Sequence, residues 1–146
     1  MEERSATFEE RRLAKAALRE VYPKGEAPVL VAGSNRLEVK AMQWGYPVSW
    51  QKGVVFNARC EKALAPGSNM WTDSLRLRRC LGHAYGFYEP HNTETTTSPK
   101  TGKAIKAQYR FGLPGSDVVF MAGVYEDGHF SIVTTAANRW MQPVHP

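Results

Sequence analysis

The sequence predicts an α+β fold: a mainly antiparallel, barrel-like β-sheet with a few packed helices. Two observations lead to this fold class. Segments rich in β-branched and aromatic residues recur through most of the chain, and the stretches between them are mostly short enough to be turns. With 146 residues, of which 42% are hydrophobic, the chain has enough apolar surface for one core, so we expect a single domain over residues 1–146.

The first element is an amphipathic helix within residues 1–26. Thr7 and Glu10 form a capping-box pattern, and apolar residues then recur at helical spacing as far as Val21. Pro23 and Gly25 end this run. The remainder, residues 27–146, is a β-rich body.

Most of the body is predicted to form strands, because β-branched and aromatic residues cluster in short segments. These segments are residues 28–32, 37–44, 53–59, 81–89, 105–113, 118–125 and 130–134. Residues 70–79 favour a short helix, and a second short helix is expected from Thr135 until Pro143 ends it. The polar residues 91–103 predict a hairpin loop.

The formal net charge of +5 is unevenly distributed. Residues 1–26 hold six acidic and six basic residues, whereas residues 27–146 hold eight acidic and thirteen basic ones. A basic body that also carries Trp44, Trp50, Trp71 and Tyr85 would suit a polyanion whose bases stack on aromatic rings. Composition alone favours the simpler alternative, that modest positive charge keeps the domain soluble.

Neither a membrane span nor a signal peptide is evident, because no segment approaches ~20 consecutive apolar residues and the first residues are charged. Cys60 and Cys80 form neither a disulfide framework nor a CxxC pair. We therefore expect a cytoplasmic protein in a reducing compartment, with no membrane association. Cys80 and His83 have the spacing of half a metal site, but no second half matches them, so no metal and no cofactor are expected.

Polar and apolar side chains alternate along residues 56–61. The two-residue period of a strand places Asn57 and Arg59 on one face, and Ala58 and Cys60 on the other. The commoner explanation is a surface strand that shows its polar side to water. Asn57 and Arg59 are nevertheless poor strand formers flanked by apolar residues, which makes them candidates for a site.

Glu89 ends an apolar and aromatic strand. Beside Phe87 and Pro90 its charged form would be disfavoured by desolvation, which suits proton transfer near neutral pH. The commoner alternative is a strand-end glutamate that faces solvent. Along an unbroken strand Cys80 falls on the face opposite Glu89, so both cysteines are predicted to be small buried hydrophobes rather than nucleophiles.

Five segments together resemble the SOS-response-associated peptidase family, SRAP. They are MQWGYPVSW at 42–50, FNARCEKA at 56–63, RRCLGHAYGFYEP at 78–90, FMAGVY at 120–125, and IVTTAAN at 132–138 followed by PVH at 143–145. Their order and spacing agree with the family over residues 28–146. Each segment alone is a weak signal, but the combination is specific.

The resemblance implies a domain that senses abasic sites in single-stranded DNA and joins to them covalently in the DNA damage (SOS) response. In the family, removal of the initiator Met leaves an N-terminal Cys, whose amine and thiol close a thiazolidine ring on the aldehyde of the opened sugar. By position, Asn57 matches the residue that holds this cysteine and Glu89 the residue that moves protons. His145, which alone is simply a terminal histidine, matches the residue that assists sugar opening.

The resemblance also implies the DNA contacts. Arg59 and Thr134 match residues near the DNA phosphates, and Trp44 and Trp50 match positions along the DNA groove. An arginine fork suits a phosphate. The implied partner is single-stranded DNA, especially with abasic sites, bound by a monomer at the bacterial nucleoid.

The chain departs from the family pattern in several places. The family begins Met-Cys-Gly-Arg, whereas this chain has Glu2 and Glu3, and a bulky Glu2 should also keep Met1 in place. The family continues beyond the position of Pro146, so the domain is expected to be incomplete at both ends. Pro90 replaces the tryptophan that usually follows F-Y-E.

Two functions therefore remain open at this point. SRAP-type peptidase or abasic-site lyase-like crosslinking is expected if a Met-Cys-Gly opening lies upstream of Met1. The alternative is a non-catalytic module that binds single-stranded DNA reversibly. Because no Ser-His-Asp spacing and no well-placed Cys-His pair appears, any peptidase activity should be limited to the protein's own N-terminus.

Overall fold

The computed structural model describes residues 19–146, which divide into two compact units. Unit 1 comprises residues 19–83 with Phe120–Thr134, and unit 2 comprises Ala84–Val119 with Thr135–Pro146. The predicted N-terminal helix falls outside the described residues, apart from its last few positions. A single domain over residues 1–146 stays a prediction.

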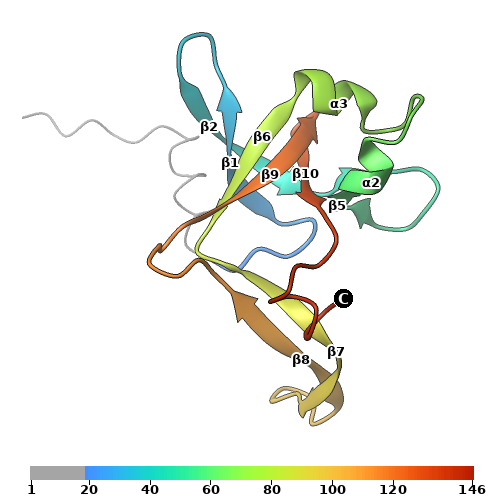
Figure 1. Ribbon diagram of the computed structural model, residues 1–146, viewed down its shortest axis with the longest axis vertical. Coiled ribbons are helices and arrows are strands. Elements are labelled where there is room, and N and C mark those ends of the chain that lie inside the picture. The colour runs from blue at the N-terminus through green and yellow to red at the C-terminus, as the bar shows by residue number, and fades with distance from the viewer. Residues whose placement is uncertain (1–18) are drawn as a thin grey trace, which may run out of the picture. The chain divides into compact units, whose positions relative to one another are not determined.

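Unit 1 is built on a six-stranded, mainly antiparallel sheet, as the sequence predicts (Figure 1). In order across the sheet, the strands are β2 (Leu37–Trp44), β1 (Glu26–Ala32), β6 (Arg79–Ala84), β9 (Val119–Glu126), β10 (His129–Thr134) and β5 (Asn57–Arg59). Strands β1 and β2 pair antiparallel, as do β9 and β10. Strand β10 also pairs in parallel with β5 and, through His129 and Phe130, with β2.

Two hydrophobic clusters stabilise this sheet. The period of two along a strand sends alternate side chains of β10 to opposite faces. Phe130 and Ile132 enter the first cluster, whereas Val133 packs against the second, which contains Ala58. The buried members of the first cluster are Val29, Val31, Met42, Cys80, Phe130 and Ile132, and those of the second are Tyr46, Ala58, Ala63, Trp71 and Val124.

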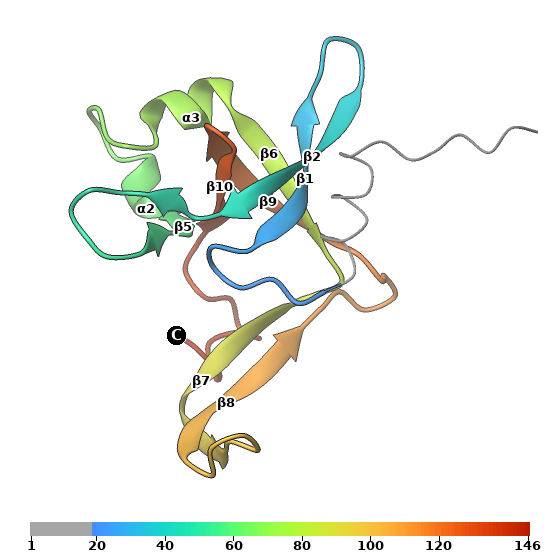
Figure 2. The ribbon, with the colours of Figure 1, turned by 180° about the vertical axis from the view of Figure 1, so that it is seen from behind.

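Helices are a minor part of the described chain. The predicted helix at residues 70–79 is present as α3 (Thr72–Leu77), and a single-turn α2 (Cys60–Ala63) follows β5 and lies beside it in both views (Figure 1, Figure 2). The short strands β3 (Tyr46–Pro47) and β4 (Val54–Val55) pair antiparallel. Both helices lie within unit 1. Ala63 of α2 and Trp71, the residue before α3, bury their side chains in the second cluster.

Unit 2 consists of a long antiparallel hairpin and the C-terminal segment. Its strands are β7 (Phe87–Thr97) and β8 (Ala104–Phe111). The prediction of a polar loop over residues 91–103 is wrong for its first half, because Thr95–Thr97 pair with residues 104–106 and prolong the ribbon. β-branched threonines favour such a strand even when both faces are exposed.

Two further predictions about local structure are wrong. The single strand over residues 81–89 is interrupted at Tyr85 and Gly86, because Gly86 has a φ of 153° and a Cβ there would lie 2.5 Å from the Phe111 carbonyl oxygen. The helix expected from Thr135 is a series of turns instead. Asn138 Oδ1 accepts the backbone N–H groups of two following residues, as an N-cap does, so helical turns begin only there, and Pro143, which has no backbone N–H, interrupts helical hydrogen bonding soon after.

Candidate functional site

The pairing of β5 with β10 places three of the predicted site residues together. In this parallel pair Asn57 lies opposite Ile132, and Arg59 lies opposite Thr134. Ala58, between them, is fully buried, while Asn57 and Arg59 are exposed, so the predicted division of the two faces is confirmed for these three residues. It does not extend to Phe56, which is exposed, or to Cys60, which begins α2. Within residues 19–146 the Asn57 side chain makes no hydrogen bond, which leaves its amide available for a ligand.

Arg59 and Thr134 carry complementary features. The Arg59 guanidinium is half exposed and only loosely paired, with its Nε 3.7 Å from Glu61 Oε2. Thr134 Oγ1 is buried and has no hydrogen-bond partner among the described residues. Buried hydroxyls normally have a hydrogen-bond partner, so the hydroxyl of Thr134 retains hydrogen-bonding capacity that the described residues do not use.

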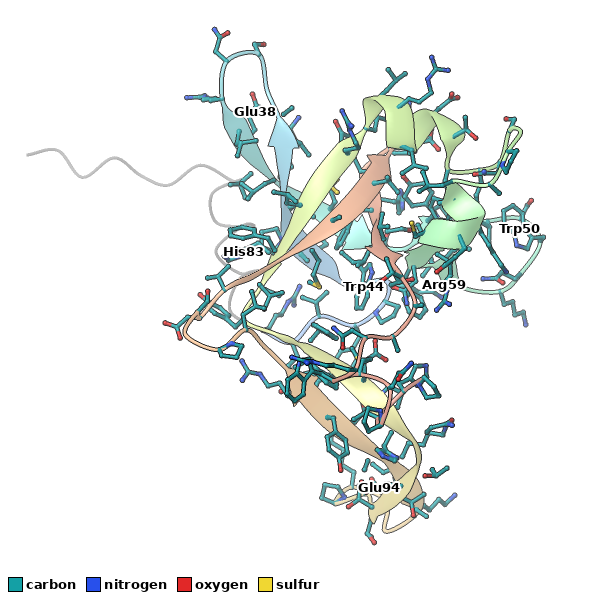
Figure 3. The ribbon with its side chains drawn as sticks, viewed as in Figure 1. Glu38, Trp44, Trp50, Arg59, His83 and Glu94 are labelled. Atoms are coloured by element: carbon teal, nitrogen blue, oxygen red, sulfur yellow. The ribbon has the colours of Figure 1, made fainter. Side chains whose placement is uncertain are left out.

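The two predicted groove tryptophans differ in exposure. Trp44 is half-buried, donates through Nε1 to the Phe56 carbonyl oxygen at 3.0 Å, and packs edge-on against the Phe56 ring at 5.5 Å. Trp50 is 66% exposed and lies on the loop between β3 and β4 (Figure 3). Trp50 is thus the better placed of the two for stacking on a base, and Trp44 for shaping the surface beside Asn57.

Glu89 lies in β7 of unit 2, opposite Tyr109 of β8. Its neighbour Phe87 stacks on Phe111, with ring centroids 5.4 Å apart. Glu89 is half-buried, and in the part of the chain that the structure describes its carboxylate has no hydrogen bond and no ion pair. A half-buried carboxylate without a partner can take up or release a proton without breaking an internal contact.

His145 lies next to the same strand. Its Nδ1 is 3.3 Å from the carbonyl oxygen of Pro90, the residue after Glu89, and the preceding Val144 accepts the Asn92 N–H at 2.7 Å. Because a carbonyl can only accept, the contact is a hydrogen bond in the tautomer with hydrogen on Nδ1, which leaves Nε2 as a proton acceptor. The structure therefore brings His145 to the strand that carries Glu89.

The cysteines differ from each other. Cys80 is buried as predicted, and burial raises its pKa to about 12, whereas Cys60 begins α2 and is only half-buried. The prediction that both are buried is thus confirmed only for Cys80. The strand break at Gly86 also means that the face of Cys80 does not fix the face of Glu89.

A thiol reagent is expected to distinguish these two residues. At pH 8 a maleimide should modify Cys60 of the folded protein, while Cys80 should react at least about 100-fold more slowly because its thiolate is scarce and covered. Digestion and mass spectrometry would locate the label, and unfolding in urea should make both thiols reactive. Equal labelling of both cysteines in the folded protein would contradict the burial of Cys80.

Some features of the surface fall outside the predicted set. An open hollow of about 460 Å³ on unit 2 is lined by Tyr85, Arg110, Gly112, Leu113, Ser116 and Asp117, none of which was predicted as a site residue. Sequence reasoning also missed Trp140, which is 70% exposed. The adjacent arginine and tryptophan in a segment without apolar periodicity were the signal that could have found it.

The described residues contain neither a cluster of metal-binding side chains nor a membrane-spanning helix. Among residues 19–146, no group of three or more His, Cys, Asp or Glu side chains could hold a metal ion. No helix in that same range is long and apolar enough to cross a membrane.

Comparison with known proteins identifies the family. The chain shows similarity to the crystal structure of a phage-related protein from Bordetella bronchiseptica, with 22% sequence identity and a TM-score of 0.59. The match covers 79% of this chain but only 55% of that protein, so this chain spans about half the length of its structural relative. No curated protein matches the sequence. The family model of the SOS response associated peptidase (SRAP) matches residues 2–146, and the chain therefore belongs to the SRAP family.

Proposed function

We propose that this chain binds single-stranded DNA, senses abasic sites in it, and joins to them covalently when its N-terminal residue is a cysteine. Family membership associates the chain with DNA damage. The observation that carries the proposal is the strand pair of β5 and β10, where exposed Arg59 lies in register with Thr134 and its orphaned hydroxyl. An exposed guanidinium fork suits a phosphodiester.

The roles of the unit 1 residues follow from their surroundings. Arg59 and Thr134 would bind phosphate, and Trp50, exposed on its loop, would stack on a base. Trp44 would form the adjoining wall of the groove. Asn57, whose amide has no hydrogen-bond partner among the described residues, would hold the N-terminal residue.

The covalent step balances with no added cofactor. The amine of an N-terminal Cys attacks the C1′ aldehyde of the opened sugar, and loss of water gives an imine. The thiol sulfur then adds to the imine carbon, and its proton passes to the nitrogen to complete the thiazolidine. Glu89 would transfer protons in both steps, and His145 would assist opening of the sugar ring through Nε2.

A second candidate function is reversible binding of single-stranded DNA without any covalent step. The exposed guanidinium of Arg59 and the exposed ring of Trp50 favour it. Phosphate-driven binding weakens steeply as salt rises. With a few phosphate contacts, the affinity for single-stranded DNA should fall by roughly 10-fold or more between about 50 and 200 mM salt. An affinity that does not change over this range would count against this function.

Covalent capture is tested by restoring the nucleophile. The double variant Glu2→Cys, Glu3→Gly should form a complex with abasic single-stranded DNA that survives denaturing electrophoresis, whereas the unchanged chain should not. Glu2→Ser, Glu3→Gly is the matched control, because it presents an amine but no thiol and should give only a reversible imine. If the cysteine variant binds this DNA but forms no stable complex, the crosslinking proposal is wrong, and absence of any binding would overturn the proposed partner as well.

A further inference from the structure

Trp140 and Arg139 form an exposed aromatic and cationic pair in the C-terminal segment of unit 2. Trp140 is 70% exposed, and the Arg139 guanidinium carbon lies 4.8 Å from the centre of its ring. Single exposed apolar side chains are common on protein surfaces, and this one is distinguished by the guanidinium that lies over its ring. None of the residues predicted for the DNA contacts lies in this pair.

The backbone holds the pair in place. Asn138 Oδ1 accepts the N–H groups of Trp140 and Met141, each at 3.0 Å, and the Asn138 carbonyl oxygen accepts the N–H of Gln142 at 2.9 Å. These three bonds fix the turn, so ordering the ring on a ligand costs only its own side-chain rotations. The turn is thus a preorganised support.

The same turn leads directly to His145. The Met141 carbonyl oxygen accepts the N–H groups of Val144 and His145, both at 2.9 Å. His145 in turn contacts the Pro90 carbonyl oxygen beside Glu89. Trp140 therefore belongs to the hydrogen-bonded segment that places His145 next to the strand that carries Glu89, all within unit 2.

Charge and geometry select the ligand. Among residues 19–146, Arg139 has no carboxylate partner, and its guanidinium lies over the Trp140 ring. The Trp140 side chain nevertheless remains 70% exposed, which leaves surface for a second flat group. An aromatic face next to an uncompensated cation matches a nucleotide, whose base stacks while its phosphate meets the arginine.

We propose that Trp140 and Arg139 form a stacking platform for a nucleotide of single-stranded DNA that flanks the abasic site. This inference rests on the proposed function and extends it from the phosphate and sugar to a neighbouring base. It assigns to unit 2 a role in selecting single-stranded over base-paired DNA, because only an unpaired base can leave its neighbours and stack on a protein ring.

The test compares two oligonucleotides that differ only in the flanking base. The first carries a tetrahydrofuran analogue of an abasic site between normal nucleotides, and this analogue has no reactive aldehyde. The second carries the same analogue at the flanking positions as well, so it lacks the flanking bases. The full chain should prefer the first by about 5-fold or more, as a stacked base implies. Trp140→Ala should lose this preference, and Trp140→Phe, which keeps a ring, should retain most of it. Phe120→Ala removes a comparably exposed ring from unit 1 and is the matched control.

Salt dependence separates the two residues. Arg139→Ala should flatten the plot of log affinity against log salt by about 0.7, the loss of one phosphate contact, while Trp140→Ala should leave the slope unchanged. Wild-type affinity that is equal for both oligonucleotides, or a Trp140→Ala variant that keeps the preference, would overturn the platform while leaving the proposed function intact. Failure of the wild-type chain to bind either oligonucleotide would overturn both.

Discussion

Replacing Glu89 with glutamine is expected to slow covalent capture of abasic DNA by about 10²–10⁴-fold, the usual contribution of a positioned general acid or base. The measurement is the rate of complex formation on denaturing gels, in the Glu2→Cys, Glu3→Gly background. Glutamine keeps the shape of Glu89 but cannot exchange a proton. Because the carboxylate has no partner among residues 19–146, its removal breaks no hydrogen bond or ion pair there, and the fold should be unaffected.

Glu94→Gln is the matched control for this prediction. Glu94 lies on the same strand, but it is exposed and accepts a hydrogen bond from Tyr109 Oη at 2.6 Å, which also raises the pKa of Tyr109. Its loss should leave the rate within about 2-fold, since an exposed carboxylate away from the reaction contributes little. If Glu89→Gln crosslinks as fast as its parent, or both glutamine variants are equally slow, Glu89 is not the proton-transfer residue.

The sheet was predictable where β-branched and aromatic residues are concentrated. Residues 37–44 are predicted as a strand from that composition and form β2 with the same bounds, although its two buried residues, Ala41 and Met42, are adjacent and do not alternate. The polar ribbon beyond His91 leaves no apolar pattern, since neither of its faces is buried. The turn at Gly86 depends on the approach of Phe111, which lies far along the chain, so a local pattern cannot show it.

The candidate site was predictable only in part. Alternation along β5 is local, and it correctly separated Asn57 and Arg59 from Ala58. The register of Arg59 with Thr134 is non-local, and only the family resemblance grouped those residues before the structure did. The orphaned hydroxyl of Thr134 and the exposed ring of Trp140 depend on tertiary packing, which periodicity does not encode.

Replacing Arg78 with alanine is expected to lower the free energy of unfolding by about 2–3 kcal/mol, a large effect for one residue in a small protein. Arg78 lies between α3 and β6, and its guanidinium contacts Glu126 Oε1 at 2.6 Å, the Tyr125 carbonyl oxygen at 3.1 Å and Ser74 Oγ at 3.2 Å. Ser74 is fully buried and also accepts a hydrogen bond from Tyr46 Oη. Alanine would leave these groups short of a donor while Ser74 stays shielded from water.

Urea unfolding measures this loss, and Arg76→Ala provides the comparison. Arg76 lies in the last turn of α3, two residues before Arg78, and carries the same charge, but it is exposed, so its replacement should change stability by less than about 0.5 kcal/mol. A double-mutant cycle identifies the cause: once Arg78 is alanine, Glu126→Gln should cost much less than it does in the intact protein. The Glu126 side chain is 45% exposed, so solvent screens part of its attraction to Arg78. The hydrogen bond from Arg78 Nε to the Tyr125 carbonyl oxygen must therefore supply part of the stability that Arg78 contributes. If the two substitutions are instead additive, the ion pair contributes nothing, and Arg78 stabilises unit 1 only by its bonds to Ser74 and Tyr125.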